Sequence, residues 1–193
     1  WLGPQDIYTS APSGLYNSLK RVNGNPAFSF YTNNSSTLDL NYVRALDAEG
    51  QTWGNPVVID ATGAVGLYNS LNIVNGNPAI CYYDATNTNL KYVRANDPDG
   101  NSWAAPMIID GLTYDAGVTL SLEIINGRPA IAYHDYTNRD LKYIRANDAN
   151  GDSWGTPVTV ESAGDVGSFA SLLDISGRPA IAYVDPNFGR LKY

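Results

Sequence analysis

The sequence predicts an all-β protein built from copies of one four-stranded antiparallel unit. The chain of 193 residues repeats itself about every 50 residues. Each repeat holds four short runs of alternating residues that are rich in β-branched and aromatic side chains. Asn, Gly and Pro, together about a quarter of the chain, separate these runs, and all three are poor helix formers. A helical bundle or coiled coil is therefore excluded.

Three tryptophans mark the period of the repeat. Trp53, Trp103 and Trp154 end nearly identical segments, of which RANDPDGNSW and RANDANGDSW are two copies. A proline follows each tryptophan three residues later, and a glycine opens the next repeat ten or eleven residues after that proline. A fixed order of strand-forming runs and turn residues of this kind indicates a repeating structural unit.

Each repeat is predicted to fold as a meander of strands A to D. In the second repeat these strands are expected at 68–74, 78–84, 90–96 and 103–109. The A–B connection Asn75-Gly76 predicts a type I′ hairpin turn, because Asn and Gly tolerate the two positive φ values that this turn requires. The same connection recurs in the other repeats, at Asn23-Gly24, Asn126-Gly127 and Ser176-Gly177.

A four-stranded antiparallel unit repeated without intervening helices resembles the blade of a β-propeller. The segment D-x-x-G-x-[S/T]-W is similar to the Asp-box turn that joins strands C and D in sialidase-like and sortilin-like propellers. It departs from that pattern because Asp47, Asp97 and Asp148 lie three residues before the glycine instead of two. The size is similar to that of hemopexin-like domains, which implies a four-bladed propeller.

The ends of the chain predict how the ring closes. Trp1, Pro4 and Gly14 have the spacing of Trp53, Pro56 and Gly66, so the first residues are expected to form a lone D strand. The expected single domain, residues 1–193, divides into a closing D strand (1–13), blades 1 to 3 (14–65, 66–116, 117–166) and strands A to C of blade 4 (167–193). The N-terminal strand would close the last blade and remove a free sheet edge. Closure between chains, or origin from a larger propeller, are the alternatives.

Composition limits the classes of molecule that the protein can bind and indicates where it is located. The formal net charge of −7 and the lack of a Lys/Arg cluster argue against binding to nucleic acid or to anionic membranes. No apolar run is long enough to insert into a membrane. An acidic composition rich in Tyr, Asn, Thr and Gly favours an extracellular or cell-surface protein, while the single Cys81 leaves the redox compartment open.

One face of the predicted disc gathers acids and tyrosines. The B–C and D–A connections share this face, so the acids at the ends of the B and D strands are expected to lie close together. Carboxylates and tyrosines in a ring could bind a cation or the hydroxyl groups of a sugar. The candidate ligand-binding residues are Asp60, Asp84, Asp110, Asp135, Asp185, Tyr68, Tyr82 and Tyr133. The alternative is that each Asp caps its own loop.

The C–D turns on the opposite face contain a second candidate site. Asp97, Asp99, Asp148 and Asn150 place oxygen atoms at alternating positions, as at the start of a calcium loop. The later acid that completes such a loop is missing, so a plain turn is the competing interpretation. Arg44, Arg94 and Arg145 are expected to form ion pairs within their own blades, with the aspartate three residues later.

Residues that break the repeat are expected to show where catalysis occurs. His134, Cys81 and Met107 are each unique, but none has a catalytic partner nearby in sequence. We therefore expect a non-enzymatic, lectin-like propeller that needs no cofactor and binds a carbohydrate or a protein surface through its repeated loops. The alternative is a structural subunit of an extracellular filament, tube or layer that self-associates by inter-chain contacts or strand donation.

Overall fold

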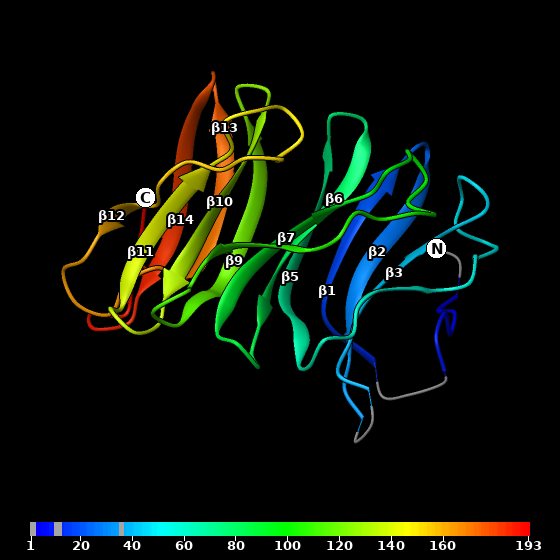
Figure 1. The fold of residues 1–193 in the computed structure, drawn as a ribbon, viewed down its shortest axis with the longest axis horizontal. Coiled ribbons are helices and arrows are strands. Elements are labelled where there is room, and N and C mark those ends of the chain that lie inside the picture. The colour runs from blue at the N-terminus through cyan, green and yellow to red at the C-terminus, as the bar shows by residue number, and fades with distance from the viewer. Residues whose placement is uncertain (1–2, 10–12, 35–36) are drawn as a thin grey trace.

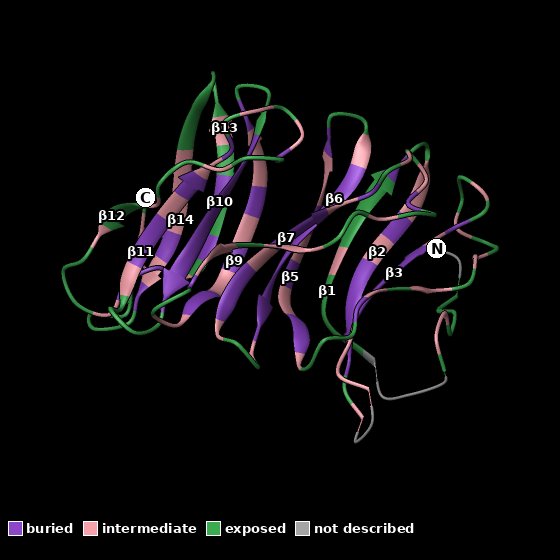
Figure 2. Cartoon of the chain, in the orientation of Figure 1, coloured by how far each residue is buried: buried purple, intermediate pink, exposed green. Residues whose placement is uncertain are grey.

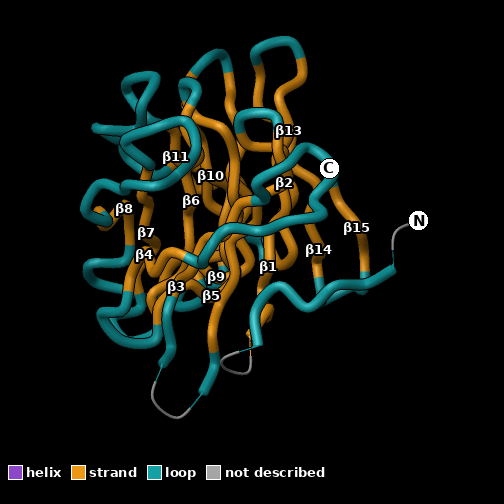
Figure 3. The backbone as a smooth tube through the Cα atoms, turned by 90° about the vertical axis from the view of Figure 1, so that its right-hand side faces the viewer, coloured by secondary structure: helices purple, strands orange, loops and turns teal. Residues whose placement is uncertain are grey.

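The computed structural model describes residues 3–9, 13–34 and 37–193, which form an all-β protein without helices (Figures 1 and 3). Fifteen strands form four antiparallel sheets in chain order. The first sheet contains β1 (Ser13–Val22), β2 (Asn25–Thr32), β3 (Leu40–Arg44) and β4 (Val57–Asp60). The second contains β5 (Val65–Val74), β6 (Asn77–Asp84), β7 (Asn89–Arg94) and β8 (Met107–Asp110). The third contains β9 (Ala116–Ile125), β10 (Arg128–Asp135), β11 (Asp140–Arg145) and β12 (Val158–Glu161), and the fourth β13 (Ser168–Ile175), β14 (Arg178–Asp185) and β15 (Arg190–Lys192).

The meander order and the A–B hairpins are confirmed. Each sheet pairs its strands in sequence order, as in β5-β6-β7-β8. Asn75 and Gly76 have φ values of 45° and 83°, the positive pair that the predicted turn requires. The D strand begins later than expected, at Met107, because Trp103 forms only an isolated bridge with Ala95 and Pro106 has no N–H to donate to the ladder.

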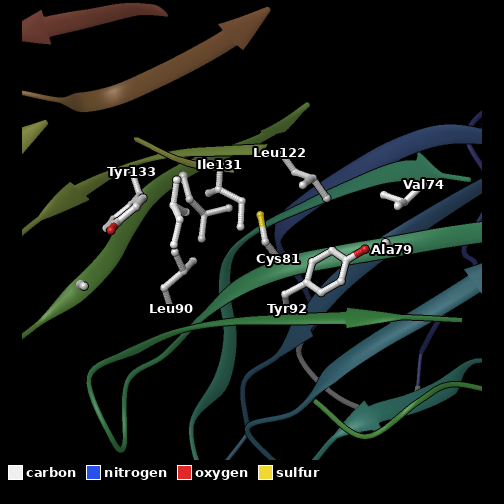
Figure 4. Close-up of a cluster of buried hydrophobic side chains, with 11 residues drawn as sticks. Val74, Ala79, Cys81, Leu90, Tyr92, Leu122, Ile131 and Tyr133 are labelled. Atoms are coloured by element: carbon white, nitrogen blue, oxygen red, sulfur yellow. The ribbon is translucent and has the colours of Figure 1, made fainter. Parts of the chain in front are cut away.

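The core lies between neighbouring sheets. Figure 4 shows side chains from the second sheet, among them Val74, Cys81 and Leu90, packed against Leu122 and Ile131 of the third. All five are at most 3% exposed. Strands of the second and third sheets, which have a neighbouring sheet on both sides, are therefore the most buried. β13 and β14 of the fourth sheet are more exposed (Figure 2).

The structure does not confirm the predicted closure of the ring. The fourth sheet has three strands, and residues 3–9 form no strand and pair with none of the described strands. Tyr8 instead packs on Phe30 of the first sheet, with ring centroids 5.4 Å apart. The first and fourth sheets lie at opposite ends of the molecule (Figure 1). The rest of the predicted closing strand, residues 1–2 and 10–12, lies outside the described residues.

The described residues contain no helix that could cross a membrane.

Candidate functional site

A pocket of about 360 Å³ lies where the first strands of all four sheets meet. Each of β1, β5, β9 and β13 contributes two consecutive residues to its wall. The lining residues are Tyr16, Asn17, Tyr68, Asn69, Thr119, Leu120, Phe169 and Ala170. We call this the axial pocket, because equivalent residues of the four repeats surround it.

Backbone strain places the first residue of each pair at the axial pocket. Tyr16, Tyr68, Thr119 and Phe169 have φ values of 51°, 52°, 49° and 55°. All four lie at irregularities in the A–B pairing. A positive φ is costly for aromatic and β-branched residues, and such strain collects at functional sites. The repeat therefore maintains an unfavourable backbone conformation in order to present side chains at this pocket.

Tyrosines extend from the axial pocket along one face. The ring centroids of Tyr16 and Tyr68 are 4.5 Å apart, and those of Tyr68 and Tyr83 of β6 are 6.3 Å apart. Tyr83 donates a hydrogen bond from its hydroxyl to Oδ1 of Asp115, at 2.8 Å. Burial, and then this hydrogen bond, raise the pKa of Tyr83 well above its usual value. The tyrosine therefore stays protonated and holds the Asp115 carboxylate beside the aromatic surface.

A second carboxylate and the single histidine lie on the same side of the molecule. Nε2 of His134 is 3.2 Å from Oδ1 of Asp165, and His134 is 5% exposed. Asp165 precedes β13 in the loop that corresponds to the loop of Asp115 before β9.

Sequence reasoning missed these two acids. Asp115 and Asp165 each lie two residues before the glycine that opens a repeat, where the second repeat has Ala64. His134 is unique, but its partner is 31 positions away in the chain and belongs to the loop before the next sheet. A comparison of the repeats column by column would have identified both acids as departures from the repeat.

The predicted acids at the strand ends form a different arrangement, a buried clamp between neighbouring sheets. Lys91 of β7 lies 3.2 Å from Asp60 of the preceding sheet and 2.7 Å from Asp84 of its own sheet. The Tyr82 hydroxyl donates to Asp60 at 2.6 Å. The clamp thus joins β4 of the first sheet to β6 and β7 of the second.

The clamp recurs at the next two interfaces. At the second, Lys142 contacts Asp135 at 2.7 Å, while Tyr133 and Tyr114 donate to Asp110. At the third, the clamp residues are Lys192, Asp185, Glu161 and Tyr183. Asp84, Asp135 and Asp185 are fully buried and also accept backbone N–H groups of their own loops. Of the eight residues predicted to bind ligand, only Tyr68 lines the axial pocket.

The clamps predict an acid-sensitive fold. Burial alone would raise the pKa of Asp60, but hydrogen bonds from Thr62 and Tyr82 outweigh it and lower that pKa. Asp135 shows the same balance, with Asn138 and Lys142 as its partners. The unfolded chain has an Asp pKa of about 3.9. A carboxyl group whose pKa is lower in the folded protein stabilises the fold at every pH above about 3.9. This contribution is lost as the pH falls from there through the lowered pKa. We expect urea midpoints to stay level from about pH 7 to pH 5 and to drop below about pH 4. An unchanged midpoint in acid would contradict this role of the clamps.

The predicted calcium residues lie in self-capped turns. The Asp97 carboxylate accepts the backbone N–H groups of Asp99, Asn101 and Ser102, and Asp148 does the same in the next repeat. Burial raises the pKa of both carboxyl groups, but these hydrogen bonds outweigh it, so that both pKa values are lowered. Asp99 and Asn150 accept side-chain amides of the neighbouring A–B turns. The turn tryptophans donate to Gly100 and Gly151, so the oxygens proposed as metal ligands already hold the turn and its neighbours together.

The expected ion pair within each blade is wrong for Arg44. Its guanidinium lies 3.2 Å from Asp99 of the second sheet, and it also donates to the carbonyl groups of Val22 and Asn23. Asp47 is engaged instead by backbone N–H groups of its own turn. The Arg44–Asp99 pair lines a pocket of about 490 Å³ beside the C–D turns.

No protein-family model and no curated protein sequence matches the chain. Solved structures do match its fold. An α-L-arabinofuranosidase from Podospora anserina in complex with cellotriose aligns with a TM-score of 0.58 at 16% identity, over 98% of this chain and 70% of its own. The catalytic domain of a Coprinopsis cinerea GH62 α-L-arabinofuranosidase aligns with a TM-score of 0.63 at 15% identity, over 98% of this chain and 65% of its own. An exo-β-1,3-galactanase from Phanerochaete chrysosporium aligns with a TM-score of 0.60 at 13% identity, over 88% of this chain and 42% of its own.

These likenesses show a β-propeller-like fold, and they correct the functional expectation drawn from the sequence. The matched proteins are glycoside hydrolases, which contradicts a non-enzymatic binding module and a purely structural subunit. The expectation depended on His134 having no catalytic partner nearby in sequence. In the structure His134 lies beside Asp165, which is 31 positions away in the chain.

Proposed function

We propose that the chain acts as a glycoside hydrolase on a carbohydrate bound at the axial pocket. The observation that carries the proposal is the position of Asp115, which is held by Tyr83 next to the aromatic surface that begins at Tyr68. Sugar rings bind to aromatic faces through their apolar C–H groups, and amide side chains such as Asn17 and Asn69 suit their hydroxyl groups.

Two carboxylates supply the chemistry that glycoside hydrolysis requires. One carboxylic acid protonates the leaving oxygen, and the other carboxylate acts as base or nucleophile. We assign the second role to Asp115, whose Oδ1 accepts a hydrogen bond from the Tyr83 hydroxyl. Asp165, with His134 beside it, is the candidate acid. The fold likeness supports this assignment, since the matched proteins are glycoside hydrolases.

The test is hydrolysis by the purified chain of 4-nitrophenyl α-L-arabinofuranoside, 4-nitrophenyl β-D-galactoside, xylotriose and β-1,3-galactotriose. We expect Asp115→Asn and Asp165→Asn each to lower the rate by about 100-fold, the contribution of one positioned acid or base. Asp174→Asn is the matched control, because Asp174 lies at the A–B turn of β13 and only accepts backbone N–H groups. No hydrolysis of any substrate, or equal rates in Asp115→Asn and the wild type, would overturn the proposal.

Two further expectations fit this function. An extracellular location suits a chain that degrades polysaccharides, and its acidic, lysine-poor composition is in keeping with that location. We also propose that the four sheets are four propeller blades with the bounds predicted from the repeat. The sheet of β13, β14 and β15 is then the fourth blade.

A further inference from the structure

Tyr136 is an exposed aromatic residue at the edge of the candidate site. It follows β10 directly, in the turn that leads to β11, and it is 62% exposed. Its ring centroid lies 6.2 Å from that of His134, and the two rings are nearly perpendicular, at 81°. His134 in turn contacts Asp165. Tyr136 therefore presents most of its side chain to solvent, next to the pair that contains one candidate catalytic carboxylate.

The backbone of the same turn holds the other candidate carboxylate residue. The Tyr136 N–H donates a hydrogen bond to the Asp115 carbonyl at 2.9 Å. The Asp115 N–H donates to Oγ1 of Thr137, also at 2.9 Å. These two bonds fix the backbone of Asp115 against the residue that carries the exposed ring. Tyr136 is thus attached to both halves of the candidate site, through its backbone on one side and through its ring on the other.

The second repeat shows that the turn does not need these side chains. There the Ala85 N–H donates to the Ala64 carbonyl, and the Ala64 N–H donates to Oγ1 of Thr86, each at 2.8 Å. The same pair of bonds therefore forms between two alanines. In the third repeat the two alanine positions are occupied by Asp115 and Tyr136. Both changes add a functional side chain to a connection that folds without it.

Tyr136 also lies close to the axial pocket. Burial is the largest cause that raises the pKa of Tyr68, and Tyr16 and then Tyr136 add to it. An electrostatic effect of this kind requires the hydroxyl groups of Tyr136 and Tyr68 to be near each other. The aromatic surface that begins at Tyr68 therefore continues to Tyr136.

We propose that Tyr136 binds one sugar ring of the substrate, beside the sugar ring that the axial pocket holds. This inference rests on the proposed function. A glycosidic bond joins two sugar residues, and a pair of carboxylates acts on it efficiently only when both residues are held in place. The ring of Tyr136 offers the C–H groups of a sugar the same kind of aromatic surface as Tyr68 does. The substrate class is therefore an oligosaccharide or polysaccharide, with a sugar residue on each side of the cleaved bond.

The first test measures KM and kcat for xylotriose and β-1,3-galactotriose. For a trisaccharide that the chain cleaves, we expect Tyr136→Ala to raise KM about tenfold, which corresponds to the loss of one aromatic contact. The kcat should stay within about twofold, because a ring that binds substrate and transition state equally affects KM alone. Tyr136→Phe keeps the ring and should retain KM within about twofold. Tyr136→Ala should fold, since the second repeat has Ala85 at the same position.

Phe188→Ala is the matched control. Phe188 is also an exposed aromatic residue, at 67%, and it lies in the corresponding turn before β15. Its ring packs against the guanidinium group of Arg190, 5.1 Å from the ring centroid. This variant should keep the KM of the wild type. Hydrolysis with an unchanged KM in Tyr136→Ala would refute the role of Tyr136 and would leave the proposed function standing.

The second test measures binding without catalysis. Calorimetry with the same two trisaccharides compares Asp115→Asn with the double variant that also carries Tyr136→Ala. We expect the double variant to bind about tenfold more weakly. If the wild type hydrolyses neither sugar but this difference is found, the proposed function fails while Tyr136 remains a sugar-binding residue. Equal affinities, or no binding by either variant, would overturn the inference.

Discussion

Replacing Lys142 by methionine is expected to lower the free energy of unfolding by about 3–5 kcal/mol, the cost of leaving a buried charge without its partner. Met is close in size, so the loss comes from charge and hydrogen bonding instead of a cavity. Lys142 lies 2.7 Å from Asp135, which is fully buried, and donates to the Tyr114 hydroxyl at 2.8 Å. Urea unfolding at neutral pH measures the effect.

The matched control is Lys20→Met, because Lys20 is exposed on β1 and forms no ion pair within the described part of the chain. Its cost should stay within about 0.5 kcal/mol, as for most surface substitutions. The second control combines Lys142→Met with Asp135→Asn. The second substitution removes the buried negative charge that Lys142→Met leaves without a partner, so it should recover part of the lost free energy of unfolding. If Lys142→Met cost no more than Lys20→Met, the clamp would be unimportant for stability.

The pH dependence of the same variant provides an independent check. Lys142 lowers the pKa of Asp135 in the folded protein. Without the lysine, burial acts on Asp135 with less opposition, so its pKa should rise. The variant should therefore lose less stability in acid than the wild type does. Urea midpoints at about pH 7 and pH 3 compare the two slopes.

The repeat explains why so much of the fold could be predicted. Hairpins such as Asn75-Gly76 and the order of strands within each sheet follow from local signals, and both were confirmed. Closure of the ring is different, since the angle between sheets depends on many side chains at each interface. No short motif encodes that angle. The N-terminal segment has the spacing of an outer strand, yet in the structure its Tyr8 packs on Phe30 of the first sheet.

The site was harder to predict than the fold because its residues come from different repeats. The acids at the strand ends were expected to lie close together, and the structure pairs them in separate contacts at each interface between sheets. Their partner was missed, because a lysine in the run LKY looks like an ordinary solvent-facing residue until the preceding sheet supplies Asp60. Asp115 and Asp165 were missed for a related reason. Acids are common in this chain, and only a contact such as Tyr83 to Asp115 distinguishes these two.

Gly117→Ala is expected to destabilise the protein by about 2–4 kcal/mol, from backbone strain and overpacking together. Gly117 has a φ of 104°, which an alanine adopts only at a cost. The added methyl group would also lie 3.0 Å from both Cα and Cβ of Leu90, which is fully buried. Neither atom can move without displacing β7, so the interface between the second and third sheets must open slightly.

Gly127→Ala separates the two causes within the same sheet. Gly127 also has a positive φ, 74°, but a methyl group there would meet no atom within 4 Å. Its substitution should cost about 1 kcal/mol, from backbone strain alone. The difference between the two variants in urea unfolding measures the contribution of the close contact between Gly117 and Leu90. Equal costs for the two variants would mean that the second and third sheets tolerate a methyl group at their interface.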